Sequence, residues 1–216
     1  ALPFVDRVMT SRDNRAMRES NERQTVALYG TFRDLNGQTV AGMTTLGTAG
    51  INGVAFAFKD YATVWSAMDG DLGAYVRAQI EKSGLHAFEK IWDNGFRQMT
   101  TSGRPIEQAK DMAGLKIRVP VSPLSISMFK ALDAAPASLQ FSEVYTALQQ
   151  GVVDGAENPV SNLYTQKMHE VQKHLTLSDH GCLVYAVITN KKFWDGLPPN
   201  IREQLEKAMK EATDYA

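Results

Sequence analysis

Two arginines and one asparagine have the side-chain types and the local sequence that best fit the binding of a small anion. Arg118 lies in segment 114–120, which reads Gly-Leu-Lys-Ile-Arg-Val-Pro, and Arg97 ends segment 92–97, which reads Trp-Asp-Asn-Gly-Phe-Arg. Asn158 lies in a Glu-Asn-Pro sequence. A guanidinium offers planar paired donors that match a carboxylate, and it does so without taking part in bond making. These residues therefore favour capture of a carboxylate over catalysis.

Arg118 is expected near the end of a strand. Apolar and polar residues alternate through its segment, and Pro120 then ends ladder pairing. In open α/β sheets, ligands gather at the carboxyl ends of strands. The alternation also gives Arg118 a different face from the apolar residues, so a solvated or salt-bridged surface arginine is the alternative interpretation.

Arg97 and Asn158 each follow a local signal that could expose donors. Arg97 comes after Asn94-Gly95-Phe96, a turn sequence that would place backbone amides beside the guanidinium. Asn158 precedes Pro159 at the expected start of a helix, where the positive end of the helix dipole favours an anion. The alternative for Asn158 is a simple N-cap residue.

Phe141 and His180 are weaker candidates when they are judged from their neighbours alone. Phe141 precedes Ser142, the expected N-cap of a helix, so it could act as a hydrophobic staple and need no ligand. His180 follows Ser178 and Asp179, which suggests a catalytic triad. Consecutive residues of a strand point to opposite faces, however, and cannot form the relay that a triad requires.

The composition excludes several classes of partner. The 216 residues carry a formal net charge of -1, which offers no basic field for nucleic acid and no polybasic stretch for anionic lipid. The single cysteine, Cys182, cannot form an intrachain disulfide and is expected to be buried. His169 and His174 fall on different faces of a helix, and no phosphate-binding glycine loop is present. We therefore predict neither a metal nor a cofactor.

The alternation of helical and extended patterns indicates an α/β fold. Asn36-Gly37 between β-branched segments predicts a hairpin within residues 25–45. Helices are expected from 61 up to an interruption at Asp69-Gly70, and over 71–82, 105–113, 123–132, 142–150, 159–175 and from 198 onward. Strands are expected at 86–92, 115–119, after Pro136, from 152 and at 183–189.

Segments 92–97 and 114–120, together with residues 141–159, which begin Phe-Ser-Glu-Val-Tyr and end Asp-Gly-Ala-Glu-Asn-Pro, and Glu170-Val171-Gln172-Lys173, resemble the extracytoplasmic substrate-binding proteins of TRAP transporters, the DctP-like family. The resemblance continues through Leu175-Thr176-Leu177, His180 and residues 190–194, and it covers residues 56–212. It implies a periplasmic-binding-protein-like fold of two lobes joined by a hinge. The expected parts are an atypical segment at 1–55, first-lobe and connecting elements at 56–116 and 178–216, and second-lobe elements at 117–177.

The resemblance also assigns roles to the candidate residues. It implies that Arg118 clamps the carboxylate of an organic acid, that Arg97 and Asn158 face the ligand, and that Phe141 lines the cleft. His180 matches a recurrent position in the family. The implied function is a periplasmic receptor, with its signal peptide removed, that delivers a small carboxylate to the membrane subunits of a TRAP transporter.

The sequence departs from the family pattern in ways that keep two alternatives open. Residues 1–50 do not match the usual opening strand and helix, Ala156 replaces the usual glutamine, and the chain stops at Ala216 before the customary C-terminal elements. An incomplete lobe would expose strand edges that a second copy could cover, which suggests a self-associating scaffold. The other alternative is an enzyme that uses His180 or Glu157 as general acid or base.

Overall fold

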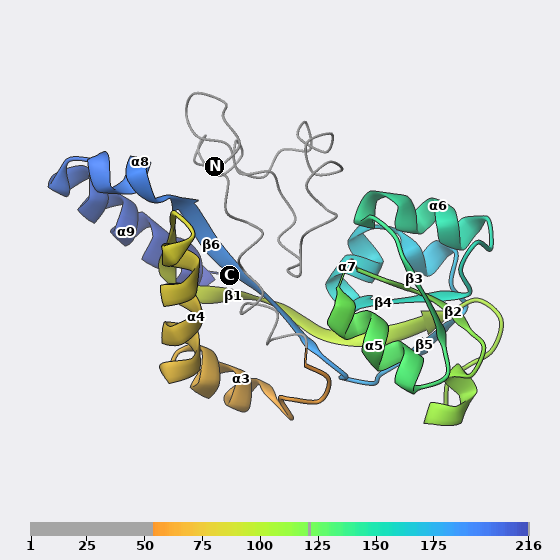
Figure 1. Cartoon of the computed structure of the whole chain (residues 1–216). Coiled ribbons are helices and arrows are strands. Elements are labelled where there is room, and N and C mark those ends of the chain that lie inside the picture. Colours follow the sequence, from red (N-terminus) through yellow and green to blue (C-terminus); the bar gives the residue numbers. More distant parts are fainter. Residues whose placement is uncertain (1–53, 121, 216) are drawn as a thin grey trace. The chain divides into compact units, whose positions relative to one another are not determined.

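Residues 54–120 and 122–215 are described by the computed structural model of the chain, and they fall into two units (Figure 1). The first unit contains 62–93 and 185–215, and the second contains 54–61, 94–120 and 122–184. The unit boundaries lie after residues 93 and 184, whereas the lobe boundaries expected from the sequence lie after 116 and 177. The hairpin predicted within 25–45 lies outside the described residues.

The described residues form one mixed sheet, which confirms the predicted α/β class. Its strands are β1 (Leu85–Thr101), β2 (Lys116–Val119), β3 (Ala135–Ser138), β4 (Gly155–Pro159), β5 (His174–Thr176) and β6 (Cys182–Asn190). Their order is β3-β2-β4-β1-β5, and β6 also pairs with β1. β2 runs parallel to β3 and β4, while β1 runs antiparallel to β4 and β5.

The α-helices of the described part are α3 (Tyr61–Met68), α4 (Asp71–Lys82), α5 (Pro123–Ala131), α6 (Val144–Gln149), α7 (Val160–Thr165), α8 (Lys191–Gly196) and α9 (Pro199–Tyr215). Short 3-10 turns occupy Ala109–Met112, Phe141–Glu143 and Met168–Glu170. None of the helices in the described ranges is long and apolar enough to cross a bilayer.

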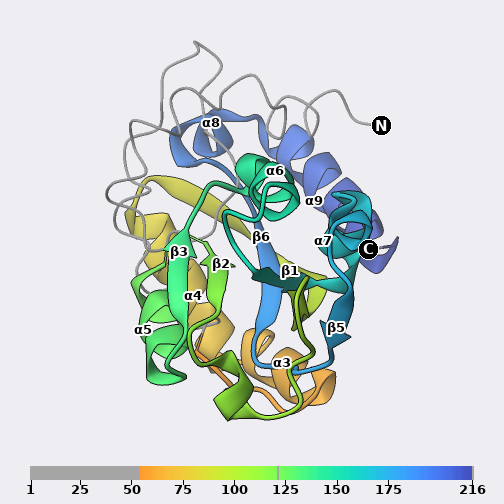
Figure 2. The same ribbon diagram turned by 90° about the vertical axis from the view of Figure 1, so that its right-hand side faces the viewer.

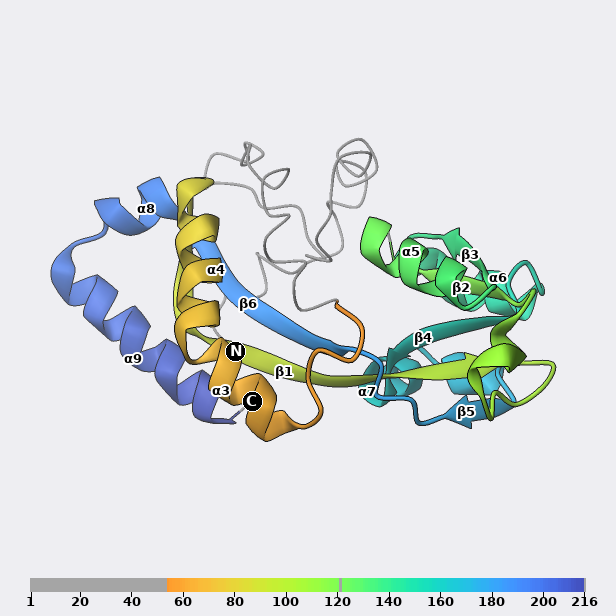
Figure 3. The same cartoon turned by 60° about the horizontal axis from the view of Figure 1, so that its bottom comes forward.

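The first unit packs α4 against its part of the sheet (Figure 3). Val76 and Ile80 of α4 are buried with Leu85 of β1 and Ile188 of β6. Helix α4 has the predicted bounds, and Gly84 follows it with a φ of 83°, the left-handed conformation that ends many helices. Helix α9 is also confirmed, but none of its residues is buried, so its expected inward face is only partly covered.

The second unit covers both faces of its sheet. One apolar cluster contains Ile117 and Val119 of β2 with Phe129 of α5, and a second contains Ala156 of β4 with Leu148 of α6. Figure 2 shows β2 and β3 side by side with α5 beside them. This arrangement is typical of parallel strands joined by helices, which bury the sheet on both sides.

The helix predicted over 159–175 is wrong. The chain forms α7, a 3-10 turn and then β5, and Lys167 between the first two adopts a φ of 57°. That left-handed residue ends α7 even though the apolar spacing continues. The strand predicted from Val152 is also wrong at its start, because β4 begins at Gly155.

Three further local predictions need correction. Asn94-Gly95 does not form a turn, because β1 runs through it, with Gly95 at a φ of 110°. The helix predicted over 105–113 is reduced to the 3-10 turn that starts at Ala109. Ser142 is not an N-cap, because Gln140 caps the turn before α6 in a capping box with Glu143.

Candidate functional site

Strand β4 supplies the centre of the site, because it lies between β2 and β1 in the second unit. Gly155 at its start is required for this close packing, since an added Cβ would lie 2.1 Å from the carbonyl oxygen of Thr100. Arg118 of β2 is registered with Ala156. Because side chains alternate along a strand, Arg118 and Asn158 share one face and Glu157 takes the other.

Arg118 is buried, with a relative exposure of 1%. Its Nε and Nη2 donate to the carbonyl oxygen of Leu139 at 3.0 and 2.7 Å, and its guanidinium carbon lies 5.9 Å from the centre of the Phe141 ring. The predicted alternation of β2 is correct, but helices cover both faces of the sheet, so the surface interpretation of Arg118 is wrong.

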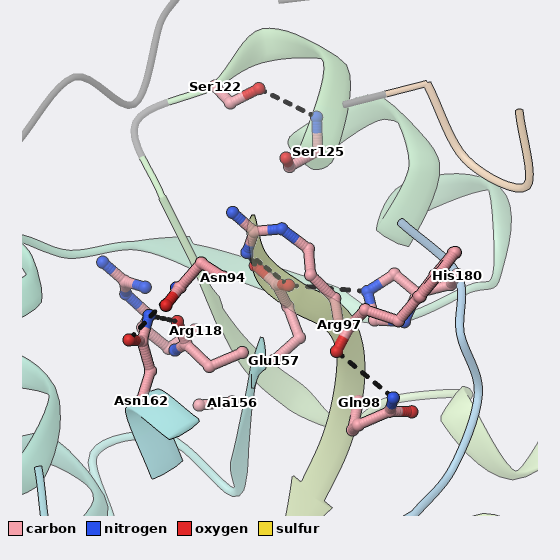
Figure 4. A network of polar contacts seen from close by, with 12 residues as sticks. Asn94, Arg97, Gln98, Arg118, Ser122, Ser125, Ala156, Glu157, Asn162 and His180 are labelled. Atoms are coloured by element: carbon pink, nitrogen blue, oxygen red, sulfur yellow. Dashed lines mark hydrogen bonds and ion pairs between the residues drawn. The ribbon is translucent and has the colours of Figure 1, made fainter. Parts of the chain in front are cut away.

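Arg97 forms a close ion pair with Glu157 on the opposite face of the sheet (Figure 4). Its Nη1 lies 2.8 and 2.6 Å from the two carboxylate oxygens, and the side chains are only 12% and 3% exposed. Nη1 donates to both oxygens of the carboxylate. Arg97 therefore has a partner within the protein that the sequence did not predict for it.

His180 completes the group around Glu157. Its Nε2 lies 3.5 Å from Oε2 of Glu157 and is buried without a well-aligned hydrogen bond, while Nδ1 lies 2.8 Å from the hydroxyl of Ser178. The edge of the ring also contacts Phe129. Burial alone would raise the pKa of Glu157, but the Arg97 charge and the adjacent His180 outweigh it and hold that pKa below its usual value. Glu157 is therefore an ionised acceptor.

The loop that carries His180 is fixed by Gln98 of β1. The Gln98 side-chain oxygen accepts from the backbone N–H groups of Ser178 and Asp179 at 2.8 and 3.2 Å. Its Nε2 donates to the Asp179 carboxylate at 2.6 Å. Asp179 adopts a φ of 43°, which is uncommon for a residue with a side chain, so these bonds help to hold the loop in place.

Asn158 is fully buried and lies within β4, so the N-cap interpretation is wrong. Pro159, rather than Asn158, precedes α7 as its cap residue. The side-chain oxygen of Asn158 accepts from Nδ2 of Asn162 at 3.3 Å. Its own Nδ2 is buried and donates no hydrogen bond within the described residues.

The structure thus arranges the predicted site residues in two groups. Arg118, Phe141 and Asn158 belong to one face of the sheet, and Arg97 and His180 gather around Glu157 on the other. Strand β4 passes between the groups and contributes a residue to each.

Several residues of the site were missed or given another role by the sequence. Glu157 was considered as a general acid or base, but it acts here as the partner of Arg97. Gln98, Asn94 and Asn162 were not singled out. Gln98 could have been found only from the pairing of β1 with β4, which places it opposite Asn158.

The two faces together hold two arginines, and Arg97 pairs with a carboxylate of the protein. Within the described residues, no group of three or more His, Cys, Asp or Glu side chains could hold a metal ion. The buried Cys182 lies at the start of β6, as predicted from its apolar surroundings.

Comparison with known protein families identifies the family of this chain. The model of the bacterial extracellular solute-binding proteins, family 7 (DctP), matches residues 41–216. The C4-dicarboxylate-binding periplasmic protein DctP of Rhodobacter capsulatus is 50% identical over 161 residues, which are 74% of this chain and 48% of that protein. The 2,3-diketo-L-gulonate-binding periplasmic protein YiaO of Escherichia coli is 37% identical over 162 residues, or 75% of this chain and 49% of that protein.

Solved structures of TRAP periplasmic solute-binding proteins also match this chain. A TRAP periplasmic solute-binding protein from Sulfurospirillum deleyianum with bound succinate matches with a TM-score of 0.71 and 45% identity, over 75% of this chain and 52% of that one. A TRAP periplasmic solute-binding protein from Polaromonas bound to D-erythronate matches with a TM-score of 0.74 and 35% identity, over 80% and 57%. The chain therefore spans about half the length of the relatives that it matches.

Proposed function

Because the chain belongs to the bacterial extracellular solute-binding proteins of family 7, we propose that it captures a small organic acid for delivery to a TRAP transporter. The observation that carries this proposal is Arg118, a fully buried guanidinium on a strand of the second unit. A guanidinium presents planar paired donors that match a carboxylate, so an organic acid is the ligand that we propose for it.

In this proposal Arg118 binds the ligand carboxylate and Asn158 adds a neutral donor on the same face of the sheet. Phe141 lines the site beside the Arg118 guanidinium. For Arg97 and His180 a ligand contact rests on the resemblance alone, because both lie around Glu157 on the other face of the sheet.

The ligand class rests on the similar proteins. Succinate and D-erythronate, found in two similar structures, each carry at least one carboxylate. Several relatives are described as periplasmic, and we infer the same location for this chain, with TRAP membrane subunits as its partners. No cofactor is required for this function.

Two alternatives are less well supported. For an enzyme, Glu157 would have to exchange a proton, but an ion pair with Arg97 and a lowered pKa make it a poor general acid or base at neutral pH. For a self-associating scaffold, the favourable observation is that no residue of α9 is buried, so a second copy could pack against this helix. The chain also spans only about half the length of its relatives. Light scattering that shows oligomers, together with no response to acids, would favour the scaffold.

The test is a thermal-shift screen of the purified chain with paired probes. Succinate, D-erythronate and related acids are each compared with the corresponding neutral amide. The proposal predicts that at least one acid raises the melting temperature in a concentration-dependent way while its amide does not. A chain that responds to none of the acids at millimolar concentration would contradict the proposal.

A further inference from the structure

Asn158 is the last member of a row of hydrogen-bonded side chains in the second unit. The hydroxyl of Ser161 donates to the backbone oxygen of Asn94 at 3.0 Å and to its side-chain oxygen at 3.3 Å. Nδ2 of Asn94 donates to the side-chain oxygen of Asn162 at 3.2 Å, and Nδ2 of Asn162 donates to that of Asn158 at 3.3 Å. Figure 4 shows Asn94 and Asn162 within this network. Every amide in the row therefore donates in the same direction.

The direction of the row decides which edge Asn158 offers beyond it. An asparagine side chain has one acceptor oxygen and one donor NH2 group, so the edge that meets Asn162 fixes the opposite edge. The Asn158 oxygen is used by Asn162, and its Nδ2 is buried without a hydrogen-bond partner in the described part of the chain. Buried donors are rarely left unsatisfied, so this NH2 group points to a missing acceptor.

The row begins at residues that are far more accessible than its end. Ser161 is exposed and Asn94 is only partly buried, whereas Asn158 is fully buried. The Ser161 hydroxyl donates to the Asn94 backbone oxygen at 3.0 Å, with the Asn94 side-chain oxygen at 3.3 Å. Two intermediate amides therefore connect the buried amide of Asn158 to the surface.

We propose that Asn94 and Asn162 are positioning residues that fix Asn158 as a hydrogen-bond donor, and that this makes the site select an acceptor, a carboxylate oxygen, at that position. The selection of a carboxylate oxygen rests on the proposed function, whereas the direction of the hydrogen bonds from Asn94 through Asn162 to Asn158 does not. It gives specificity that the arginines cannot supply alone, because a guanidinium attracts any anion whereas a fixed NH2 group rejects a ligand that presents its own donor.

Asn94→Asp tests the direction with a change of one atom. A carboxylate only accepts, so Asn162 must turn its NH2 group toward residue 94 and its oxygen toward Asn158. Asn158 then turns as well and offers its oxygen to the ligand. Asn94→Ala removes the first amide without imposing a reversal, and Val160→Asp adds the same charge at a nearby exposed position outside the row.

The first readout uses the ligand-free protein. In side-chain ¹⁵N–¹H spectra of the wild type, the Asn162 NH2 protons should show the downfield shift of a hydrogen-bonded amide, and those of Asn158 should not. In Asn94→Asp the Asn158 protons should move downfield, while Val160→Asp should leave them in place. Asn158 signals that stay unchanged in Asn94→Asp would overturn the proposed row whether or not the chain binds acids.

The second readout is calorimetry with succinate and its monoamide, succinamate. Asn94→Asp should weaken succinate binding by roughly tenfold or more, and it should lower the preference for succinate over succinamate, because Asn158 now offers an acceptor. Asn94→Ala should give an affinity for succinate between those of the wild type and Asn94→Asp, because it removes the first amide of the row without imposing a reversal. Val160→Asp should change both affinities by less than about threefold. An Asn94→Asp effect no larger than that of Val160→Asp would overturn the selectivity role, whereas failure of the wild type to bind any acid would contradict the proposed function itself.

Discussion

Replacement of Arg118 is the perturbation for which the structure gives the most definite magnitude. Each charge-assisted hydrogen bond contributes about 1.5–3 kcal/mol, and a guanidinium that grips a carboxylate through two bonds would therefore contribute about 3–6 kcal/mol. At 1.4 kcal/mol per tenfold, Arg118→Met should weaken acid binding by roughly a hundredfold to ten-thousandfold. Methionine keeps the packing beside Phe141 and removes the charge.

Arg118→Lys separates charge from geometry at the same position. Lysine keeps the positive charge but lacks the planar fork, so we expect an affinity between those of the wild type and Arg118→Met. The control is Arg104→Met, since Arg104 is an exposed arginine of the same unit that donates to the backbone oxygens of Asp111 and Ala113. That control should leave the affinity for acids unchanged.

The assay is isothermal calorimetry with succinate, accompanied by thermal unfolding of each variant. Loss of Arg118 leaves the Leu139 carbonyl without its donors, which costs about 1–3 kcal/mol of stability, so the folded fraction of each variant must be measured first. A folded Arg118→Met protein that binds succinate within about twofold of the wild type would refute the role of this guanidinium.

Three other changes test the packing and electrostatics around β4. Glu157→Gln should destabilise the chain by about 3–5 kcal/mol, because it removes the carboxylate that pairs with the buried Arg97 charge. Since the pKa of Glu157 is lowered in the folded state, the wild type should lose this stabilisation as the pH falls below about 4. An equally steep loss of stability in acid for the variant would contradict the ion pair. Gly155→Ala should lower the free energy of unfolding in urea by about 1–3 kcal/mol or more, because its Cβ would collide with the Thr100 carbonyl oxygen. Gly103→Ala should not, because a Cβ there meets no atom within 4 Å, and equal effects would contradict the packing of β4 on β1. Gln98→Leu should speed proteolysis of the 178–180 loop, because it removes the acceptor for two backbone N–H groups, and an unchanged cleavage rate would show that the loop is held by other contacts.

Much of the fold could be predicted because local signals and tertiary structure agree. Helix α4 and strand β6 have simple apolar patterns, and they form close to their predicted bounds. The helix predicted over 159–175 failed because apolar spacing does not reveal where a residue such as Lys167 leaves the helical conformation. The strand through Asn94-Gly95 was missed because the pairing of β1 with strands that are distant in sequence outweighs the local preference for a turn.

The sequence suggests candidate site residues, but it does not reveal their contacts. Residue type and resemblance pointed to Arg118 and Asn158, and both are buried in the second unit. Neither could reveal that Arg97 pairs with Glu157, because an ion pair between strands depends on register. Burial of Arg118 likewise depends on the helices that cover both faces of the sheet, which alternation within one strand cannot indicate.

Native mass spectrometry of the chain, purified without added ligand, is the most direct test of carboxylate capture. The account predicts a bound species with the mass of a small organic acid, which exchanges for added succinate in the wild type and is absent from Arg118→Met. A chain that carries no acid and gains none when succinate is added at millimolar concentration would contradict it.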